Sequence, residues 1–132
     1  MRSLTLTKEQ LQNMLDHAVG HAPLEACGLL AGKNLKVEKV IEIRNQAESP
    51  VRYVMDPLEQ LDGFEWIESN GMELLGIFHS HPSGPENVSP TDVAESAYAV
   101  VQVILARVDQ AWSTHGYWLE GRLVEQVRLI IE

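Results

Sequence analysis

The sequence has few of the features that mark secreted, membrane-spanning or nucleic-acid-binding proteins. Cys27 is the only cysteine among 132 residues, so no disulfide can form within the chain, and we expect a reducing, cytoplasmic setting. No apolar stretch approaches the roughly 20 residues of a membrane-spanning helix, and the polar start predicts no signal peptide. Ten basic residues face 19 acidic ones, for a net charge of −9, which disfavours nucleic-acid binding.

Capping residues predict where the helices begin. Thr7 and Gln10 have the spacing of a capping box, and the helix that follows should bury one face. That face would carry Leu11, Met14, Leu15, Ala18 and Val19. Asp56 and Pro57 predict the start of a second helix, which we expect to end near residues 70–71. A third helix should begin at Pro90.

Apolar and alternating segments between these helices predict strands. The expected strands cover residues 3–6, 25–31, 35–43, 73–78, 101–108, 114–119 and 123–131. The last two should form a hairpin around Glu120 and Gly121. We therefore expect one domain over residues 1–132, an α/β sandwich with a central mixed sheet flanked by helices. The order of the strands does not follow from this pattern.

Two histidines lie at the end of the strand expected before residue 79. Successive strand side chains point to opposite faces, so His79 and His81 share a face and can aim at one point. Asp92, one turn into the next helix, could join them. Two imidazoles and a carboxylate suit Zn²⁺, and three protein ligands leave one position open, as in catalytic zinc sites. Such a metal lowers the pKa of its water to about 7.

A structural interpretation of the same residues is also available. Two histidines one residue apart are a weak pattern alone. Ser89, Pro90 and Asp92 also satisfy an ordinary helix start, with a serine cap, a proline at the first position and an acid in the first turn. Taken separately, each half is more typical of structure than of catalysis.

The complete spacing decides between these readings. The segment His79-Ser80-His81-Pro82, followed by Ser89 and then Asp92, resembles the motif of the JAMM (MPN-plus) metalloprotease family. That motif also requires a glutamate on a separate segment upstream. The stretch from Pro23 to Leu30 resembles the family's sequence there, which places the glutamate at Glu25. The resemblance implies a cytidine-deaminase-like α/β fold over most of the chain.

The resemblance assigns a role to each residue. His79, His81 and Asp92 would hold Zn²⁺, with water as the fourth ligand. Glu25 would take a proton from that water as general base and pass it to the leaving amine. Ser89 would donate a hydrogen bond to the oxyanion, so its hydroxyl could not serve the helix cap alone.

The short chain and its Glu25–Leu30 segment are similar to the compact prokaryotic branch of the family. That similarity implies cleavage after the C-terminal Gly-Gly of a small ubiquitin-like sulfur-carrier protein, releasing an amino acid such as cysteine or a peptide. The tail would bind extended, as a strand added at a sheet edge. A deubiquitinase-like enzyme, a DNA-repair-associated relative and a metal-free scaffold module are the alternatives. The acidic composition gives little support to the DNA-repair-associated relative, and the complete ligand set argues against the metal-free scaffold module.

Other reactive side chains have simpler interpretations. Cys27 lies in an apolar segment, where a small buried thiol is expected. His17 and His21 fall near the end of the first helix, where the helix dipole favours a cation. We expect both to be structural. His115 lies among the aromatic residues of the predicted hairpin, which we interpret as packing or edge surface. The chain lacks the HxE and PCxxC segments of zinc deaminases.

Overall fold

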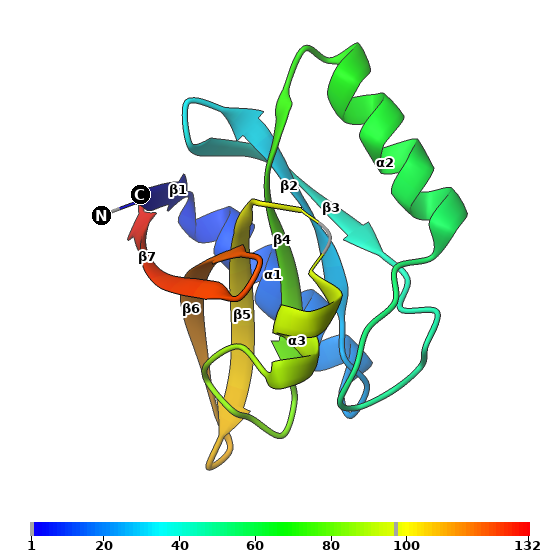
Figure 1. Cartoon of the computed structure of the whole chain (residues 1–132), viewed down its shortest axis with the longest axis vertical. Helices are drawn as coiled ribbons and strands as arrows, with labels where there is room; N and C mark the ends of the chain where they lie inside the picture. The colour runs from blue at the N-terminus through cyan, green and yellow to red at the C-terminus, as the bar shows by residue number, and fades with distance from the viewer. Residues whose placement is uncertain (1, 97) are drawn as a thin grey trace.

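The computed structural model of the protein describes residues 2–96 and 98–132. Within these residues, seven strands and three helices alternate along the chain (Figure 1). Their order is β1 (Ser3–Leu6), α1 (Lys8–His21), β2 (Cys27–Lys33), β3 (Lys36–Ile43), α2 (Pro57–Ser69), β4 (Glu73–His81), α3 (Pro90–Glu95), β5 (Val101–Val108), β6 (Ala111–Glu120) and β7 (Leu123–Ile131).

All seven strands belong to one mixed sheet. The spatial order is β1-β3-β2-β4-β5-β6-β7, and β7 pairs with β1, so the sheet closes on itself. Strand β4 is parallel to β5 and antiparallel to β2. The predicted α/β class with a mixed sheet and flanking helices is confirmed. Closure was not predicted, because it depends on β1 pairing with both β7 and β3, which lie far away along the chain.

Helix α1 begins with the predicted capping box. The Thr7 hydroxyl accepts from the Gln10 backbone N–H at 3.0 Å, and the Gln10 side chain accepts in return from Thr7 N–H at 2.9 Å. The predicted apolar face was wrong at Val19, which is 54% exposed. His17 is buried instead, because it lies three residues after the fully buried Met14, on the same stripe of the helix. None of the helices within residues 2–96 and 98–132 is long and apolar enough to span a bilayer.

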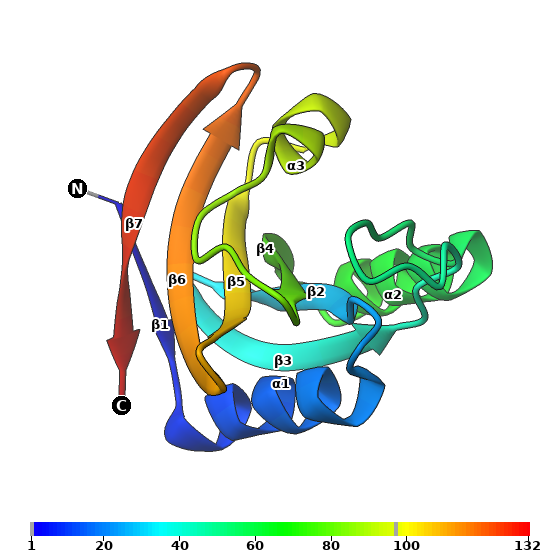
Figure 2. The same cartoon turned by 90° about the horizontal axis from the view of Figure 1, so that it is seen from below.

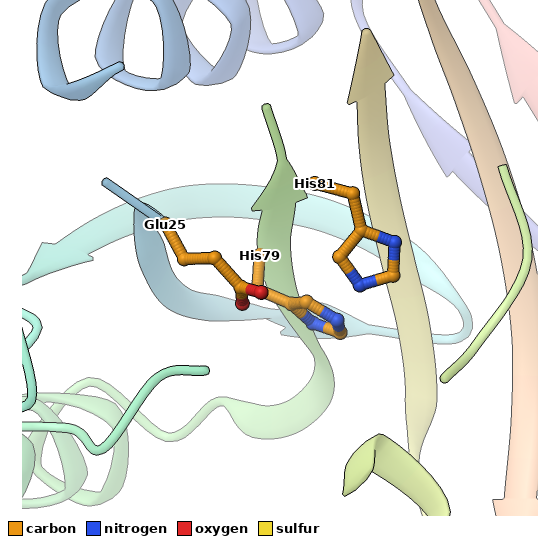
Figure 3. A group of neighbouring side chains, drawn as sticks. All are labelled: Glu25, His79 and His81. Atoms are coloured by element: carbon orange, nitrogen blue, oxygen red, sulfur yellow. The ribbon is translucent and has the colours of Figure 1, made fainter. Parts of the chain in front are cut away.

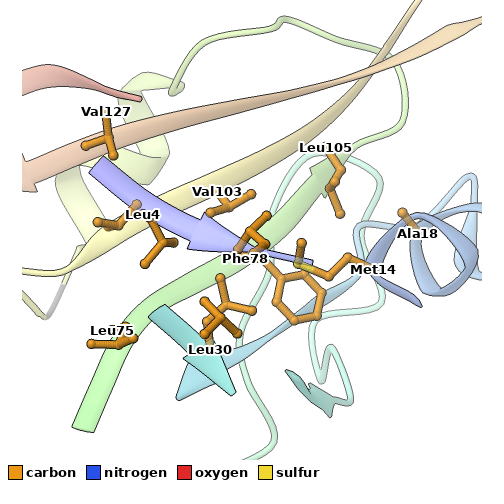
Figure 4. Close-up of a cluster of buried hydrophobic side chains, with 12 residues drawn as sticks. Leu4, Met14, Ala18, Leu30, Leu75, Phe78, Val103, Leu105 and Val127 are labelled. Atoms are coloured by element: carbon orange, nitrogen blue, oxygen red, sulfur yellow. The ribbon is translucent and has the colours of Figure 1, made fainter. Parts of the chain in front are cut away.

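The two faces of the sheet pack against different helices. Leu30, Phe78 and Val103 share a core cluster with α1, on one face (Figure 4). Leu29 and Ile77 share a cluster with residues of α2, on the opposite face. Figure 2 shows α1 along one side of the sheet, whereas α2 and α3 do not lie on that side. Because side chains alternate along a strand, the residues that follow Ile77 at two-residue spacing also point away from α1.

Two predicted strand boundaries, at the start of β2 and the end of β4, were inaccurate. Glu25 does not belong to β2, which begins at Cys27. The backbone of Glu25 is used elsewhere: its N–H donates to the Ser49 carbonyl at 2.8 Å, and its carbonyl accepts from Asn45 Nδ2 at 3.0 Å. Strand β4 is longer than predicted and continues through His81. The glutamate therefore lies in an irregular segment, while both histidines are fixed by strand pairing.

Candidate metal centre

His79 and His81 lie on one face of β4, near the middle of the closed sheet. His79 pairs with Cys27 of β2, and His81 pairs with Ala106 of β5. Strands on both sides leave the histidines only 0% and 3% exposed. Their ring centroids are 5.0 Å apart. The predicted convergence of the two imidazoles is therefore present (Figure 3).

Asp92 reaches both histidines from α3. Its Oδ2 lies 3.2 Å from His79 Nε2 and 3.0 Å from His81 Nε2. The loop that joins β4 to α3 returns over the strand end, where His81 Nδ1 lies 2.8 Å from the Pro85 carbonyl oxygen. A carbonyl only accepts, so a proton lies on Nδ1, and in the neutral form of His81 the lone pair of Nε2 faces the carboxylate. Two facing acceptors need a proton or a metal ion between them.

Glu25 completes the cluster from the segment before β2. One ligand atom from each of Glu25, His79 and His81 lies within 4.8 Å of the others, and Figure 3 shows the Glu25 carboxyl directed toward the His79 ring. Glu25 is only 2% exposed. Burial raises its pKa to about 8, an effect that nearby His81 opposes and Asp92 reinforces. A cation beside this carboxyl would favour its ionised form.

Several buried polar atoms of the cluster have no hydrogen-bond partner. Among the described residues, this holds for Glu25 Oε1 and for both ring nitrogens of His79; the short contact of His79 Nε2 with Asp92 lacks hydrogen-bond geometry. Leaving a buried polar atom unpaired costs about 1–3 kcal/mol. Two imidazole nitrogens and a carboxylate oxygen are the usual ligands of Zn²⁺. The residues therefore fit this ion, which would take up one of the two unpaired ring nitrogens of His79.

The charge states of His79 and Asp92 also suit a cation. Burial lowers the pKa of His79, so its ring is neutral and its lone pair is available. Burial opposes ionisation of Asp92, but the close approach of His79 and His81 outweighs this and holds its pKa well below the usual range. For His81, burial is likewise outweighed by hydrogen bonds to Asp92 and to the Pro85 carbonyl, and its pKa is raised. An ionised carboxylate thus faces both histidines.

Ser89 is the N-cap residue of α3. Its Oγ accepts from the Asp92 backbone N–H at 3.0 Å, while the Asp92 carboxylate accepts from Ser89 N–H at 2.9 Å. The cap therefore uses the oxygen of the hydroxyl and leaves its hydrogen available. This resolves the competition expected from the sequence, because one hydroxyl can accept at the cap and donate to another group.

Tyr53 is a neighbour of the cluster that the sequence pattern did not identify. Its ring stacks on His79 with centroids 4.7 Å apart and an interplanar angle of 26°. Burial raises the pKa of its hydroxyl, so Tyr53 is uncharged. The stacked ring limits rotation of His79, in the way that groups around a metal site orient its ligands. Tyr53 lies in an irregular segment between β3 and α2, with no local signal to single it out.

A cleft of about 280 Å³ adjoins the cluster. One wall is the segment Tyr53–Met55, and the opposite wall is α3, including Asp92 and Glu95. An exposed ion pair between Arg52 and Glu95, with Nη2 and Oε1 3.0 Å apart, connects the two walls. The cleft therefore meets the cluster at Asp92, whose carboxylate faces both histidines.

The remaining candidate residues lie apart from the cluster's chemistry. Cys27 is fully buried, and burial raises the pKa of its thiol to about 12, so it is not a nucleophile. His17 is buried with Nε2 3.2 Å from the Cys27 carbonyl oxygen, and burial lowers its pKa, contrary to the expected cation. His115 Nε2 lies 2.7 Å from Ser113 Oγ, within β6.

Comparison with known families gives a match over most of the chain. The family model Prok-JAB, described as prokaryotic homologs of the JAB domain, matches residues 7–116. This span contains Glu25, both histidines, Ser89 and Asp92.

Three curated relatives are named for cleavage reactions. A probable TtuB-protein conjugate cleaving protease of Thermus thermophilus is 41% identical over 71% of this chain and 64% of its own length. A desampylase of Pyrococcus furiosus is 34% identical over 86% of this chain and 81% of its own. A CysO-cysteine peptidase of Mycobacterium tuberculosis is 34% identical over 68% of this chain and 63% of its own. The chain thus spans somewhat under two thirds of the Thermus and Mycobacterium proteins.

Solved structures share the fold. A protein of Desulfitobacterium hafniense superposes with a TM-score of 0.86 at 33% identity, over 98% of this chain and 92% of that one. A structure described as JAMM, a metalloprotease-like zinc site in the proteasome and signalosome, superposes with a TM-score of 0.62 at 18% identity, over 98% of both chains. The resemblance found in the sequence is confirmed: the chain belongs to the prokaryotic JAB family of JAMM-type proteins.

Proposed function

We propose that this protein is a zinc metallopeptidase that cleaves after the C-terminal Gly-Gly of a small ubiquitin-like sulfur-carrier protein. The observation that carries the proposal is the convergence of His79, His81 and Asp92 beside the unpaired carboxyl of Glu25. A zinc ion held there would polarise the scissile carbonyl and acidify the attacking water. The names of the Thermus and Mycobacterium relatives, with TtuB conjugates and CysO-cysteine as substrates, support this substrate class.

The protein's own residues would divide the remaining work. Glu25 would accept a proton from the attacking water and pass it to the leaving amine, which a buried carboxylate with a raised pKa does well near neutral pH. Ser89 would direct its free hydroxyl hydrogen toward the carbonyl oxygen as negative charge develops there. Tyr53 and the Pro85 carbonyl would keep His79 and His81 in position.

The cleft suggests how an extended tail would bind. Strand addition within the cleft would use the segment Tyr53–Met55, which lines it. In this segment Val54 and Asp56 are paired with the 44–46 region: Gln46 N–H donates to the Val54 carbonyl, and Asp56 N–H to the Arg44 carbonyl. Backbone groups of alternate residues point to opposite sides. Those of Tyr53 and Met55 are therefore available to a substrate.

Ser89→Ala should lower kcat by roughly 10²–10³-fold, the usual loss for one oxyanion donor. The change also removes the cap of α3, worth about 1 kcal/mol, so thermal melting must accompany the kinetics. Ser89→Thr keeps a hydroxyl for both tasks and is the matched control. Equal activity of the alanine variant and wild type would exclude Ser89 from the reaction.

The substrate assignment is tested with carriers extended beyond Gly-Gly. Zinc-loaded protein is incubated with small sulfur-carrier proteins that carry one or more additional C-terminal residues, and the products are weighed by mass spectrometry. We expect removal of the extension immediately after the second glycine, and loss of cleavage with a chelator. Alanine or leucine in place of either glycine should block the reaction.

Other outcomes distinguish the alternatives. Intact carriers together with cleaved ubiquitin chains would favour a deubiquitinase-like enzyme and overturn the carrier assignment. Protein that binds no zinc and cleaves none of these substrates would favour a scaffold module.

A further inference from the structure

Gln102 is a buried polar residue at the floor of the cleft, outside the metal cluster. It lies on β5, pairs with Ile77 of β4 and lines the cleft with Tyr53 and Tyr98. Its neighbours on the same face of β5 are apolar: Ile104, two residues on, is fully buried in a core cluster. A polar side chain at this position is therefore not explained by packing of the strand.

The side-chain oxygen of Gln102 is unsatisfied. The residue is 2% exposed, and its Oε1 has no hydrogen-bond partner among the described residues. Buried side-chain amides are normally paired, because an unpaired acceptor has lost its hydrogen bonds to water without replacement. The final torsion of a glutamine is soft, so the amide can turn its oxygen or its nitrogen toward the cleft. An amide at the base of a cleft suits one ligand group above all, a peptide unit with its own N–H and C=O.

The register of the strands fixes how far Gln102 is displaced from His79 along the direction of β4. On β4, Ile77 is opposite Gln102, and His79 follows two residues later. Two strand residues span about 6.6 Å, at roughly 3.3 Å each. In an extended peptide whose scissile carbonyl is at the histidines, this distance corresponds to the backbone N–H two residues before the bond that breaks.

We propose that Gln102 positions the substrate by accepting a hydrogen bond from the backbone N–H of the first glycine of the Gly-Gly tail. This inference rests on the proposed function. The tail, rather than the leaving group, is assigned because it is common to all the proposed substrates, and an anchor left unpaired by some of them would weaken their binding.

The burial of Gln102 also explains a need for glycine. A backbone N–H must come within about 3 Å of the acceptor to form a hydrogen bond, and this acceptor is at the cleft floor between Tyr53, Met55 and Ile77. A side chain on the approaching residue would hold its backbone away from the floor. Glycine has no Cβ and permits such close approach.

The test combines a variant with a modified substrate. Gln102→Met keeps the size of the side chain and removes its polar group. For an extended carrier, we expect KM to rise about tenfold, the loss of one hydrogen bond, with kcat unchanged. A second, semisynthetic carrier has an ester in place of the peptide bond that carries the N–H of the first glycine. For wild type, KM should be about tenfold higher on this ester carrier than on the normal carrier. For Gln102→Met, KM should be the same on both carriers.

The controls separate positioning from structure. Gln126→Met makes the same change on an exposed position of β7 and should leave KM unchanged. If Gln102 has only a structural role, Gln102→Met should have a lower melting temperature than wild type. Wild type should then cleave the ester carrier and the normal carrier equally well. The ester result needs no variant, so it stands even if Gln102→Met folds poorly.

Each outcome has a separate meaning. Wild type that cleaves both carriers with equal KM overturns the role of Gln102 and leaves the peptidase assignment intact. Wild type that cleaves neither carrier overturns the substrate proposal and, with it, this inference.

Discussion

Replacing any one of His79, His81 and Asp92 with alanine should abolish zinc binding at the proposed site. Purified wild type is expected to contain one zinc per chain, and each of His79→Ala, His81→Ala and Asp92→Ala should contain almost none. Removing a partner that only orients a ligand already costs about 10–100-fold in metal affinity, so loss of a ligand should cost more. Elemental analysis after gel filtration measures the content directly.

The controls address chemistry and folding. His21→Ala removes an exposed histidine at the end of α1 and should keep its zinc. Asp92→Asn keeps an oxygen that can accept from Ser89 N–H, so it separates loss of the ligand from loss of the α3 cap. Zinc should raise the melting temperature of wild type, because a ligand that binds only the folded state stabilises it, and should not raise that of the variants. Undiminished zinc in all three alanine variants would contradict the assignment.

Glu25→Gln should abolish most activity and keep the metal. The substitution preserves the shape of the side chain and removes the group that accepts the proton. General base catalysis contributes roughly 10²–10⁴-fold, so kcat on an extended carrier should fall by that factor. Steady-state kinetics on zinc-loaded protein, with zinc content measured on the same sample, gives the result.

Glu38→Gln is the matched control, because it makes the same chemical change on an exposed position of β3. It should leave both kcat and zinc content unchanged. Near-normal turnover of Glu25→Gln would remove Glu25 from the mechanism. Loss of zinc in that variant would instead make Glu25 a ligand, a possibility raised by its position within 4.8 Å of both histidines.

Local chemistry made several elements predictable from the sequence. The capping residues Thr7 and Asp56 start α1 and α2 where predicted, because a cap acts only on the next few backbone groups. The pair His79 and His81 was also predictable, since the two-residue period of a strand alone puts both on one face. The helix start at Pro90 followed from the same kind of local signal.

Features that depend on distant segments were not predictable in this way. Strand β6 begins at Ala111, earlier than expected, because its turn uses Asp109 and Gln110 at positive φ rather than glycine. Tyr53 and Gln102 come from segments about 50 residues apart and line one cleft only through the pairing of β4 with β5 and the return of the chain before α2. The position of Glu25 followed from family resemblance, since its irregular backbone has no strand pattern to reveal it.

Closure of the sheet has a consequence for how the protein behaves at high concentration. Open sheets present rows of unpaired N–H and C=O groups at their outer strands, where a second chain can add and begin aggregation. Here β1 joins β7 through four residue pairs, from Ser3 with Arg128 to Leu6 with Ile131, and the two ends of the sheet protect each other. The protection is incomplete at β3, because among the described residues β1 pairs with it only through Thr5 and Lys36. The rest of that edge of β3 is therefore where unwanted self-association would begin.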